Sequence, residues 1–284
     1  MHKNQSPIPK ILIDNDKFFI YGHRGLSGYK IENTMSSFHL ALKRKVDGIE
    51  LDVQKTSDGE IIVFHDESLE KITGDNTPIS ELNFRDISNI NVNVNHGNNE
   101  KDYIPKLIDV INIIPKNIML NIEIKSYKKD DKGICEYVDD IIDKYNIYEN
   151  TIISSFDPLI LNNVKKRNNK IPIALIWNGK TKLVKSCVKF LKPSAFHINI
   201  NFINNNIVNW MHRRNIKVYA YTVNSTKVLD FAKACNLDGI FTDIDLITIS
   251  VSMTSLTYFA GGVLLGLFMI AIIGCFMKIC NRNE

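Results

Sequence analysis

Two histidines and a pair of carboxylates occur where short apolar segments of the chain end, and these residue types suit chemistry on a phosphate ester. His23 follows an apolar run near the start of the chain, and His65 follows a later one. An imidazole titrates near neutral pH, so the two histidines are candidates for an acid and a base. Glu50 and Asp52 lie two residues apart in a β-branched segment. A strand there would point both carboxylates to the same side.

Glu123 supplies a third carboxylate near the end of another apolar segment. Three such acids form a set of hard oxygen ligands, which suits Mg²⁺ or Ca²⁺ better than zinc because no thiolate joins it. One acid alone would more often pair with Arg24 or Lys125. Three acids on adjacent strand ends repel one another unless a cation holds them. We therefore expect a divalent metal at Glu50, Asp52 and Glu123.

Arg24 and Lys125 follow the same apolar segments and are candidates for binding phosphate oxygens. Arginine offers a planar fork of donors, whereas lysine offers a point charge. If the two segments are strands that end inside a barrel, neither side chain can extend into solvent as a surface charge.

Short β-branched segments alternate with amphipathic ones through most of the chain and must position these residues. The predicted strands are Phe18–Tyr21, Gly48–Val53, Met119–Ile124, Thr151–Ser154, Pro172–Ile176, Ala195–Ile198, Lys217–Tyr221 and Gly239–Thr242. A further strand, Ile61–Phe64, follows the turn Ser57-Asp58-Gly59 and indicates a hairpin. Eight strand–helix units predict an α/β protein with a (β/α)₈ barrel. A doubly wound open sheet stays the alternative, because alternation alone does not separate the two.

The barrel is expected over residues 18–248, with a small insertion at about 67–103. The insertion is rich in Asn and matches neither a strand nor a helix pattern. In such barrels the active site lies at the C-terminal ends of the strands, which is where the polar candidates fall.

Composition excludes several other classes of function. The net charge is +4 and the basic residues are scattered, so no nucleic-acid partner is expected. The cysteines form no CxxC pair, which argues against a zinc or redox motif and favours a reducing compartment.

Residues 256–277 contain no charged residue, and a bilayer core needs roughly 20 apolar residues. They predict a C-terminal transmembrane helix, and hence a single-pass membrane protein with the lipid bilayer as a partner. Gly262 and Gly266 form a GxxxG step that would allow a homodimer through this helix. No signal peptide is visible, which places the barrel in the cytosol. Lys278 and Arg282 favour a cytoplasmic tail instead, so the orientation stays open.

The chain contains a series of short motifs between about Phe18 and Asp243: His23-Arg24-Gly25, Glu32-Asn33-Thr34, Glu50-Leu51-Asp52-Val53, His65-Asp66, Ile104-Pro105-Lys106-Leu107, Glu123-Ile124-Lys125, Ser155-Phe156, Tyr221-Thr222-Val223-Asn224 and Asp238-Gly239-Ile240-Phe241-Thr242-Asp243. In their order and spacing, these motifs resemble the glycerophosphodiester phosphodiesterase family. The family usually has Trp where Tyr221 stands, so the wall of the site differs there.

The resemblance implies a TIM barrel, a divalent metal, and hydrolysis of glycerophosphodiesters to an alcohol and glycerol 3-phosphate. It also implies a role for each candidate residue, with the insertion helping to bind the glycerol end. The implied catalytic pair is His23 and His65, the metal ligands are Glu50, Asp52 and Glu123, and the phosphate contacts are Arg24 and Lys125.

Other readings of the sequence stay open. A lysophospholipase D would act on membrane lysophospholipids with the same residues, and a non-catalytic, membrane-anchored barrel would use none of them. A phosphoinositide-cleaving lipase shares the two-histidine barrel. The spacings Glu50-Leu51-Asp52 and Glu123-Ile124-Lys125 fit the glycerophosphodiesterase better.

Overall fold

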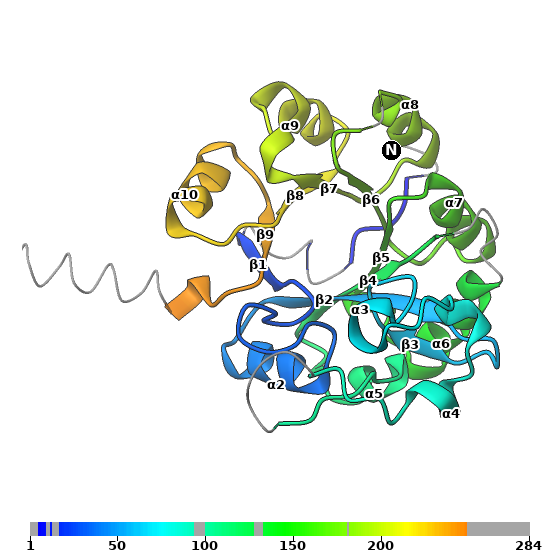
Figure 1. The fold of residues 1–284 in the computed structure, drawn as a ribbon. Helices are drawn as coiled ribbons and strands as arrows, with labels where there is room; N and C mark the ends of the chain where they lie inside the picture. The colour runs from blue at the N-terminus through cyan, green and yellow to red at the C-terminus, as the bar shows by residue number, and fades with distance from the viewer. Residues whose placement is uncertain are drawn as a thin grey trace, which may run out of the picture. The chain divides into compact units, whose positions relative to one another are not determined.

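Eight parallel strands close into a barrel in the computed structural model (Figure 1). The structure describes residues 5–9, 12, 17–93, 100–127, 133–180 and 182–248. The barrel strands are β1 (Phe19–Gly22), β2 (Gly48–Lys55), β4 (Met119–Ile124), β5 (Thr151–Ser155), β6 (Ile173–Trp177), β7 (Ala195–Asn199), β8 (Lys217–Tyr221) and β9 (Gly239–Thr242). All lie where the alternating pattern predicts them, with ends shifted by at most two residues.

Closure of the sheet distinguishes the barrel from an open doubly wound sheet. Strand β1 pairs in parallel with β2, with Tyr21 opposite Gly48, and also with β9, with Phe19 opposite Gly239. The first and last strands are therefore neighbours, and the barrel prediction is confirmed. Strand β3 (Ile61–Val63) pairs antiparallel with β2 and completes the predicted hairpin.

Helices surround the barrel, and capping side chains mark where several of them begin (Figure 1). Thr34 forms a capping box at the start of α2, and Asp157 accepts a hydrogen bond from the Leu159 N–H at the start of α7. The helices are α2 (Met35–Lys43), α5 (Leu107–Ile111), α6 (Ile134–Tyr145), α7 (Pro158–Arg167), α8 (Val184–Leu191), α9 (Asn205–His212) and α10 (Thr226–Ala234). Two short 3₁₀ turns, η2 (Tyr148–Asn150) and η3 (Ile200–Phe202), join them.

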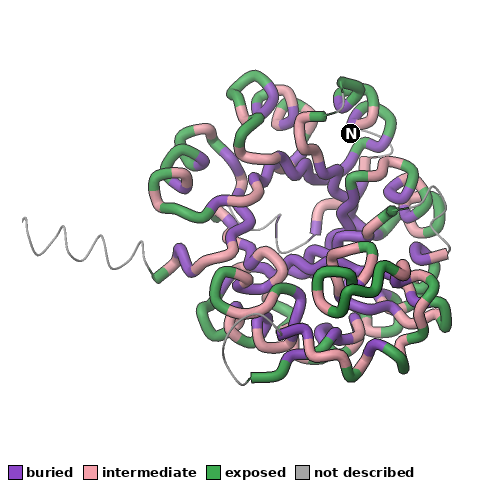
Figure 2. Tube along the Cα trace, viewed as in Figure 1, coloured by how far each residue is buried: buried purple, intermediate pink, exposed green. Residues whose placement is uncertain are grey.

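The barrel interior is apolar near the beginnings of its strands and polar near their ends. Met119, Ile152, Ala174 and Ala195 lie at or next to the first residue of their strands and belong to one buried cluster. Figure 2 shows the barrel strands as a continuous buried ring, with exposed surface on the outer helices. One end of the barrel is thus filled by apolar packing, and the polar side chains lie toward the other.

The insertion is more ordered than its sequence pattern predicts. It contains α3 (Glu70–Thr73), η1 (Ile79–Glu81) and α4 (Phe84–Ile87). Leu69, Ile79 and Ile87 are buried in a separate apolar cluster with Ile62 and Ile104. These segments therefore form short helices although their sequence matches no helix pattern, and residues 94–99 lie outside the described part.

The predicted membrane location is corrected by the structure. Within the described ranges, no helix has the length and apolar character required to cross a bilayer. The chain divides into units at 1–245 and 246–284, and the expected span at 256–277 lies outside the described residues. An uncharged apolar run shows that a segment avoids water, which by itself does not place it in a bilayer. The transmembrane helix, the bilayer as a partner and a homodimer through that helix thus gain no support.

Candidate active site

A cavity of about 270 Å³ opens among the C-terminal ends of the barrel strands. Six of the seven candidate residues named from the sequence line it, and the seventh, Asp52, lies buried beside it. The lining residues are His23, Arg24, Glu50, His65, Asn121, Glu123, Lys125, Phe156, Ile176, His197, Asn199, Tyr221, Thr222 and Phe241.

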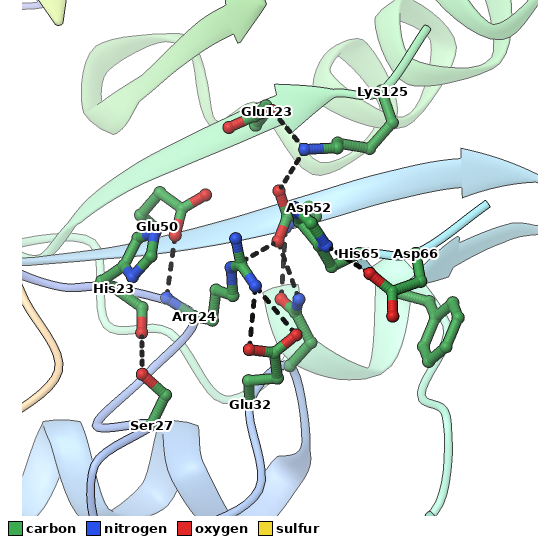
Figure 3. Close-up of polar contacts among 12 residues, drawn as sticks. His23, Arg24, Ser27, Glu32, Glu50, Asp52, His65, Asp66, Glu123 and Lys125 are labelled. Atoms are coloured by element: carbon green, nitrogen blue, oxygen red, sulfur yellow. Dashed lines mark hydrogen bonds and ion pairs between the residues drawn. The ribbon is translucent and has the colours of Figure 1, made fainter. Parts of the chain in front are cut away.

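The three predicted metal ligands lie together on neighbouring strands (Figure 3). Asp52 on β2 stands opposite Glu123 on β4, and one carboxylate oxygen from each of these and from Glu50 lies within 4.8 Å of the others. Glu50 Oε1 and Asp52 Oδ1 are buried and make no hydrogen bond among the described residues, although Lys125 Nζ lies 3.3 Å from Asp52 Oδ1. A buried carboxylate oxygen without a partner is costly, whereas a hard divalent cation would use such oxygens as ligands. The donor set therefore fits Mg²⁺ or Ca²⁺.

Both candidate phosphate-binding residues are ion-paired with these acids. Lys125 Nζ lies 2.6 Å from Glu123 Oε1 and 3.3 Å from Asp52 Oδ1. Arg24 Nε lies 3.1 Å from Asp52 Oδ2, and its Nη1 donates to both oxygens of Glu32 at 2.8 Å (Figure 3). From the sequence, ion pairing and metal binding were alternatives for these acids. The structure combines an acid cluster with two cations at its edge.

The three acids differ in protonation because their neighbours differ. Burial and then the charge of Asp52 raise the pKa of Glu50 to about 8. Burial also opposes ionisation of Asp52, but Lys125 and Arg24 outweigh it and lower the pKa of this carboxyl. Burial and the charge of Asp52 raise the pKa of Glu123 despite the adjacent Lys125. Asp52 is therefore the firmly charged member of the cluster.

A tight turn after β1 directs Arg24 into the cluster. Arg24 has φ +54° and Gly25 has φ +81°, and the Arg24 N–H donates to Glu50 Oε2 at 2.8 Å. A Cβ on Gly25 would lie 2.4 Å from Ser37 Oγ, so this position needs glycine for both space and backbone angle. Asn33 supports the other acid, because its Nδ2 donates to Asp52 Oδ2 at 2.8 Å.

Each candidate histidine is held by an aspartate at its Nδ1. His23 Nδ1 lies 2.7 Å from Asp243 Oδ1, which follows β9, and His65 Nδ1 lies 2.8 Å from Asp66 Oδ1. A carboxylate at Nδ1 favours the proton on that nitrogen and leaves Nε2 to exchange a proton with a ligand. Asp243 was not among the residues assigned a role from the sequence, although its place after the last strand of a closed barrel puts it beside the first strand.

The two imidazoles are electrostatically different. Burial lowers the pKa of His23, but the hydrogen bond to Asp243 and the charge of Glu50 outweigh it and raise the pKa above its ordinary value. Burial lowers the pKa of His65, and although Asp52 opposes this, Arg24 and Lys125 add to it, so the result is a lowered pKa. An acid and a base working together need such unequal groups.

His197 lies deeper than the candidate pair and has a different environment. It is buried, and burial alone lowers its pKa to about 3. Its ring packs against Tyr219 and Phe241, with centroids at 5.7 and 4.8 Å. His197 is therefore a neutral part of the cavity wall near neutral pH.

Comparisons with known proteins give a consistent result. The model of the "Glycerophosphoryl diester phosphodiesterase family" matches residues 23–244, a span that contains all the candidate residues. A glycerophosphodiester phosphodiesterase of Caldanaerobacter subterraneus is 32% identical over 233 residues, covering 80% of this chain and 94% of that protein. A protein of the same description from Bacillus altitudinis is 30% identical over 231 residues, covering 79% and 94%.

Solved structures show the same fold. A putative glycerophosphoryl diester phosphodiesterase from Silicibacter pomeroyi aligns with a TM-score of 0.74 at 20% identity, covering 81% of this chain and 90% of that one. An Oleispira antarctica phosphodiesterase, in complex with the product sn-glycerol-3-phosphate, aligns with a TM-score of 0.70 at 22% identity, covering 82% and 96%.

Proposed function

Because the chain belongs to the glycerophosphoryl diester phosphodiesterase family, we propose that the cavity at the barrel mouth is the active site of a phosphoric diester hydrolase. The reaction is metal-dependent hydrolysis of glycerophosphodiesters to an alcohol and glycerol 3-phosphate. One observation carries the proposal most strongly. Three buried carboxylates, two aspartate-held imidazoles and two cations are gathered at one cavity. Burying these charged groups together opposes folding, and a non-catalytic barrel would gain no function in return.

Glu50, Asp52 and Glu123 would hold the metal, and Mg²⁺ and Ca²⁺ both suit their oxygens. The oxygens of Glu50 and Asp52 that lack hydrogen-bond partners support this assignment. A bound divalent cation supplies positive charge that polarises a phosphoryl oxygen.

Arg24 and Lys125 would bind the phosphate oxygens beside that position. Burial opposes their charged forms, but the neighbouring carboxylates outweigh it and raise the pKa of both groups. Both therefore stay cationic throughout the working pH range. They would neutralise negative charge that otherwise repels an attacking oxygen and would stabilise the charge that develops at phosphorus.

His23 and His65 would move the two protons of the reaction. One imidazole accepts the proton of the attacking oxygen, which belongs to water or to a neighbouring glycerol hydroxyl. The other donates a proton to the alcohol oxygen as its bond to phosphorus breaks. Asp243 and Asp66 would fix the rings by holding Nδ1, so that Nε2 takes part in each transfer.

Hydrolysis of glycerophosphocholine by the full chain tests the proposal. We expect activity after EDTA treatment only when Mg²⁺ or Ca²⁺ is restored. His23→Ala and His65→Ala should each lower kcat/KM by about 10²–10⁴-fold, which is the usual contribution of a general acid or base. His39→Ala, at an exposed position of α2, is the matched control and should act like wild type. Wild-type turnover by either cavity variant would contradict the assignment.

A further inference from the structure

The active-site cavity has a charged half and a neutral half. The side chains that line the charged half follow or belong to β1, β2, β3 and β4: His23, Arg24, Glu50, His65, Glu123 and Lys125. Strands β5, β6, β7 and β8 are successive neighbours in the sheet and contribute Phe156, Ile176, His197, Asn199 and Tyr221. Among the described residues that line this second half, none carries a full charge near neutral pH. A phosphodiester bound in the charged half would therefore extend one of its ester groups over neutral, largely aromatic surface.

Phe156 and Tyr221 form the aromatic wall of the neutral half. Their ring centroids are 6.3 Å apart and the rings are nearly perpendicular, at 88°. The Tyr221 hydroxyl donates to the Trp177 carbonyl at 3.1 Å, which fixes that ring, whereas Phe156 is 43% exposed. Lys125 Nζ lies 5.9 Å from the centroid of Phe156, so this ring already faces a cation at the boundary with the charged half. The wall thus offers electron-rich ring surface next to the phosphate position.

The chemistry of this wall discriminates among leaving alcohols. A polyol or a primary ammonium brings several donors that need acceptors once they leave water. In the neutral half, Asn199 Oδ1 already accepts the Asn201 N–H at 3.0 Å, so this acceptor is partly engaged before a ligand binds. A quaternary ammonium has no N–H to satisfy, and aromatic faces attract it through their quadrupoles.

We infer that Phe156 and Tyr221 bind the leaving alcohol and select one that carries a quaternary ammonium group, such as choline. This inference rests on the proposed function of the same site and adds a substrate class to it.

A pair of substrates isolates the cationic contribution. Glycerophosphocholine and the 3,3-dimethylbutyl ester of glycerol 3-phosphate have leaving groups of the same shape, with nitrogen replaced by carbon in the second. We expect the wild-type chain to favour the choline ester in kcat/KM by about 5- to 30-fold, the range typical of a partly desolvated cation–π contact. Glycerophosphoethanolamine should also be the poorer substrate.

Four variants connect this preference to the wall. Phe156→Leu and Tyr221→Leu should each move the ratio of the two kcat/KM values toward one. Tyr221→Phe keeps the ring and should keep most of the preference. Phe231→Leu, on α10 and 47% exposed, changes a phenyl ring outside the cavity lining and should leave the ratio unchanged.

The outcomes separate this inference from the proposed function. The inference would be overturned if the ratio of the two kcat/KM values were near one in the wild-type chain, or unchanged in both Leu variants, while hydrolysis continued. Either result would show that the wall does not recognise the positive charge of the alcohol. Failure of the wild-type chain to hydrolyse either ester with any divalent ion would overturn the proposed function, and the inference with it.

Discussion

At the scale of single residues, Glu50 is the least ordinary group of the site. It is buried beside a charged Asp52, and its pKa of about 8 means that it mostly keeps its proton at pH 7 when no metal is bound. The proposed binding of a metal through Glu50 would therefore release a proton from this carboxyl, because the ligand form is the anion.

The metal-free protein should lose stability as pH rises. The pKa of Glu50 is higher in the folded chain than its ordinary value of 4.5, so the folded state binds more protons between about pH 4.5 and pH 8. The contribution of Glu50 to the free energy of unfolding is complete below that range and decreases through it. Glu50→Gln should remove much of this dependence. Thermal unfolding in EDTA from pH 5 to pH 8 measures it as a fall in Tm of several degrees, since about 1 kcal/mol corresponds to roughly 2–4 °C in a domain of this size.

Glu70→Gln is the matched control, because Glu70 is exposed on α3. It should keep the wild-type pH dependence. Equal slopes for wild type and Glu50→Gln would contradict the raised pKa. Added Mg²⁺ or Ca²⁺ should raise the Tm of the wild-type chain and have a much smaller effect on Glu50→Gln.

The sequence identified the acids, imidazoles and cations of the cavity, but not how they pair. Spacing in a strand predicts which side chains share a face, and this was enough for Glu50 and Asp52. The contact between His23 and Asp243 joins residues 220 positions apart and depends on the pairing of β1 with β9. Local patterns contain no information about such a contact. The ion pairs of Lys125 with Glu123 and Asp52 likewise depend on the register between β2 and β4.

At the scale of elements, Asp238 connects the end of the barrel to two earlier segments. It precedes β9 and accepts hydrogen bonds from the Val218 N–H at 2.7 Å and from His212 Nε2 at 2.9 Å. Lys217 Nζ lies 2.9 Å from its other oxygen. One carboxylate thus joins α9, β8 and β9. Burial opposes its ionisation, but these contacts outweigh burial and lower its pKa.

Asp238→Asn should destabilise the chain in a pH-dependent manner. Because the folded pKa lies below the unfolded value, the stabilisation is present above about pH 3.9 and is lost as pH falls through the folded pKa. We expect a loss of about 1–3 kcal/mol at pH 7, as is usual for hydrogen bonds to a charged group. The difference from wild type should shrink below about pH 4. Urea unfolding at pH 7 and pH 3.5 measures both values.

Asp230→Asn, at an exposed position of α10, serves as the control and should leave the unfolding midpoint unchanged at both pH values. A loss in Asp238→Asn that did not change with pH would mean that the side chain acts through its shape and not through its charge.

Elements were predicted well where the sequence is strongly periodic. The barrel strands follow from β-branched runs in the sequence. The helices of the insertion, α3 and α4, have four residues each. A segment that short completes little more than one turn, so it leaves no recurring apolar spacing to detect. Their position depends on burial of Leu69 and Ile87 against the hairpin, which is a tertiary effect.

At the scale of the whole molecule, the seam between β1 and β9 closes the barrel and should be the place least tolerant of added volume. Gly239 stands opposite Phe19, and a Cβ at this position would lie 2.2 Å from the Phe19 carbonyl oxygen. Gly239→Ala would force the two strands apart, and we expect it to cost at least about 1–3 kcal/mol, as overpacking does in cores. Chemical denaturation measures this loss.

Asn206→Ala, at an exposed position of α9, controls for a small surface change and should be nearly neutral. His23 follows β1 directly, so Gly239→Ala should also lower kcat/KM if the first strand moves. A variant as stable and as active as wild type would show that the seam can relax without cost.

The split of the cavity between two sets of strands has a consequence for how such an enzyme can diversify. In the proposed enzyme, bond cleavage would depend on the side chains that follow β1 to β4, and recognition of the departing group on those that follow β5 to β8. Substitutions at the ends of β5 to β8 can then change substrate selectivity while the residues that cleave the bond stay the same. An engineer could exchange two rings for hydrogen-bonding side chains and redirect the catalyst toward sugar or inositol esters without redesigning its reactive centre.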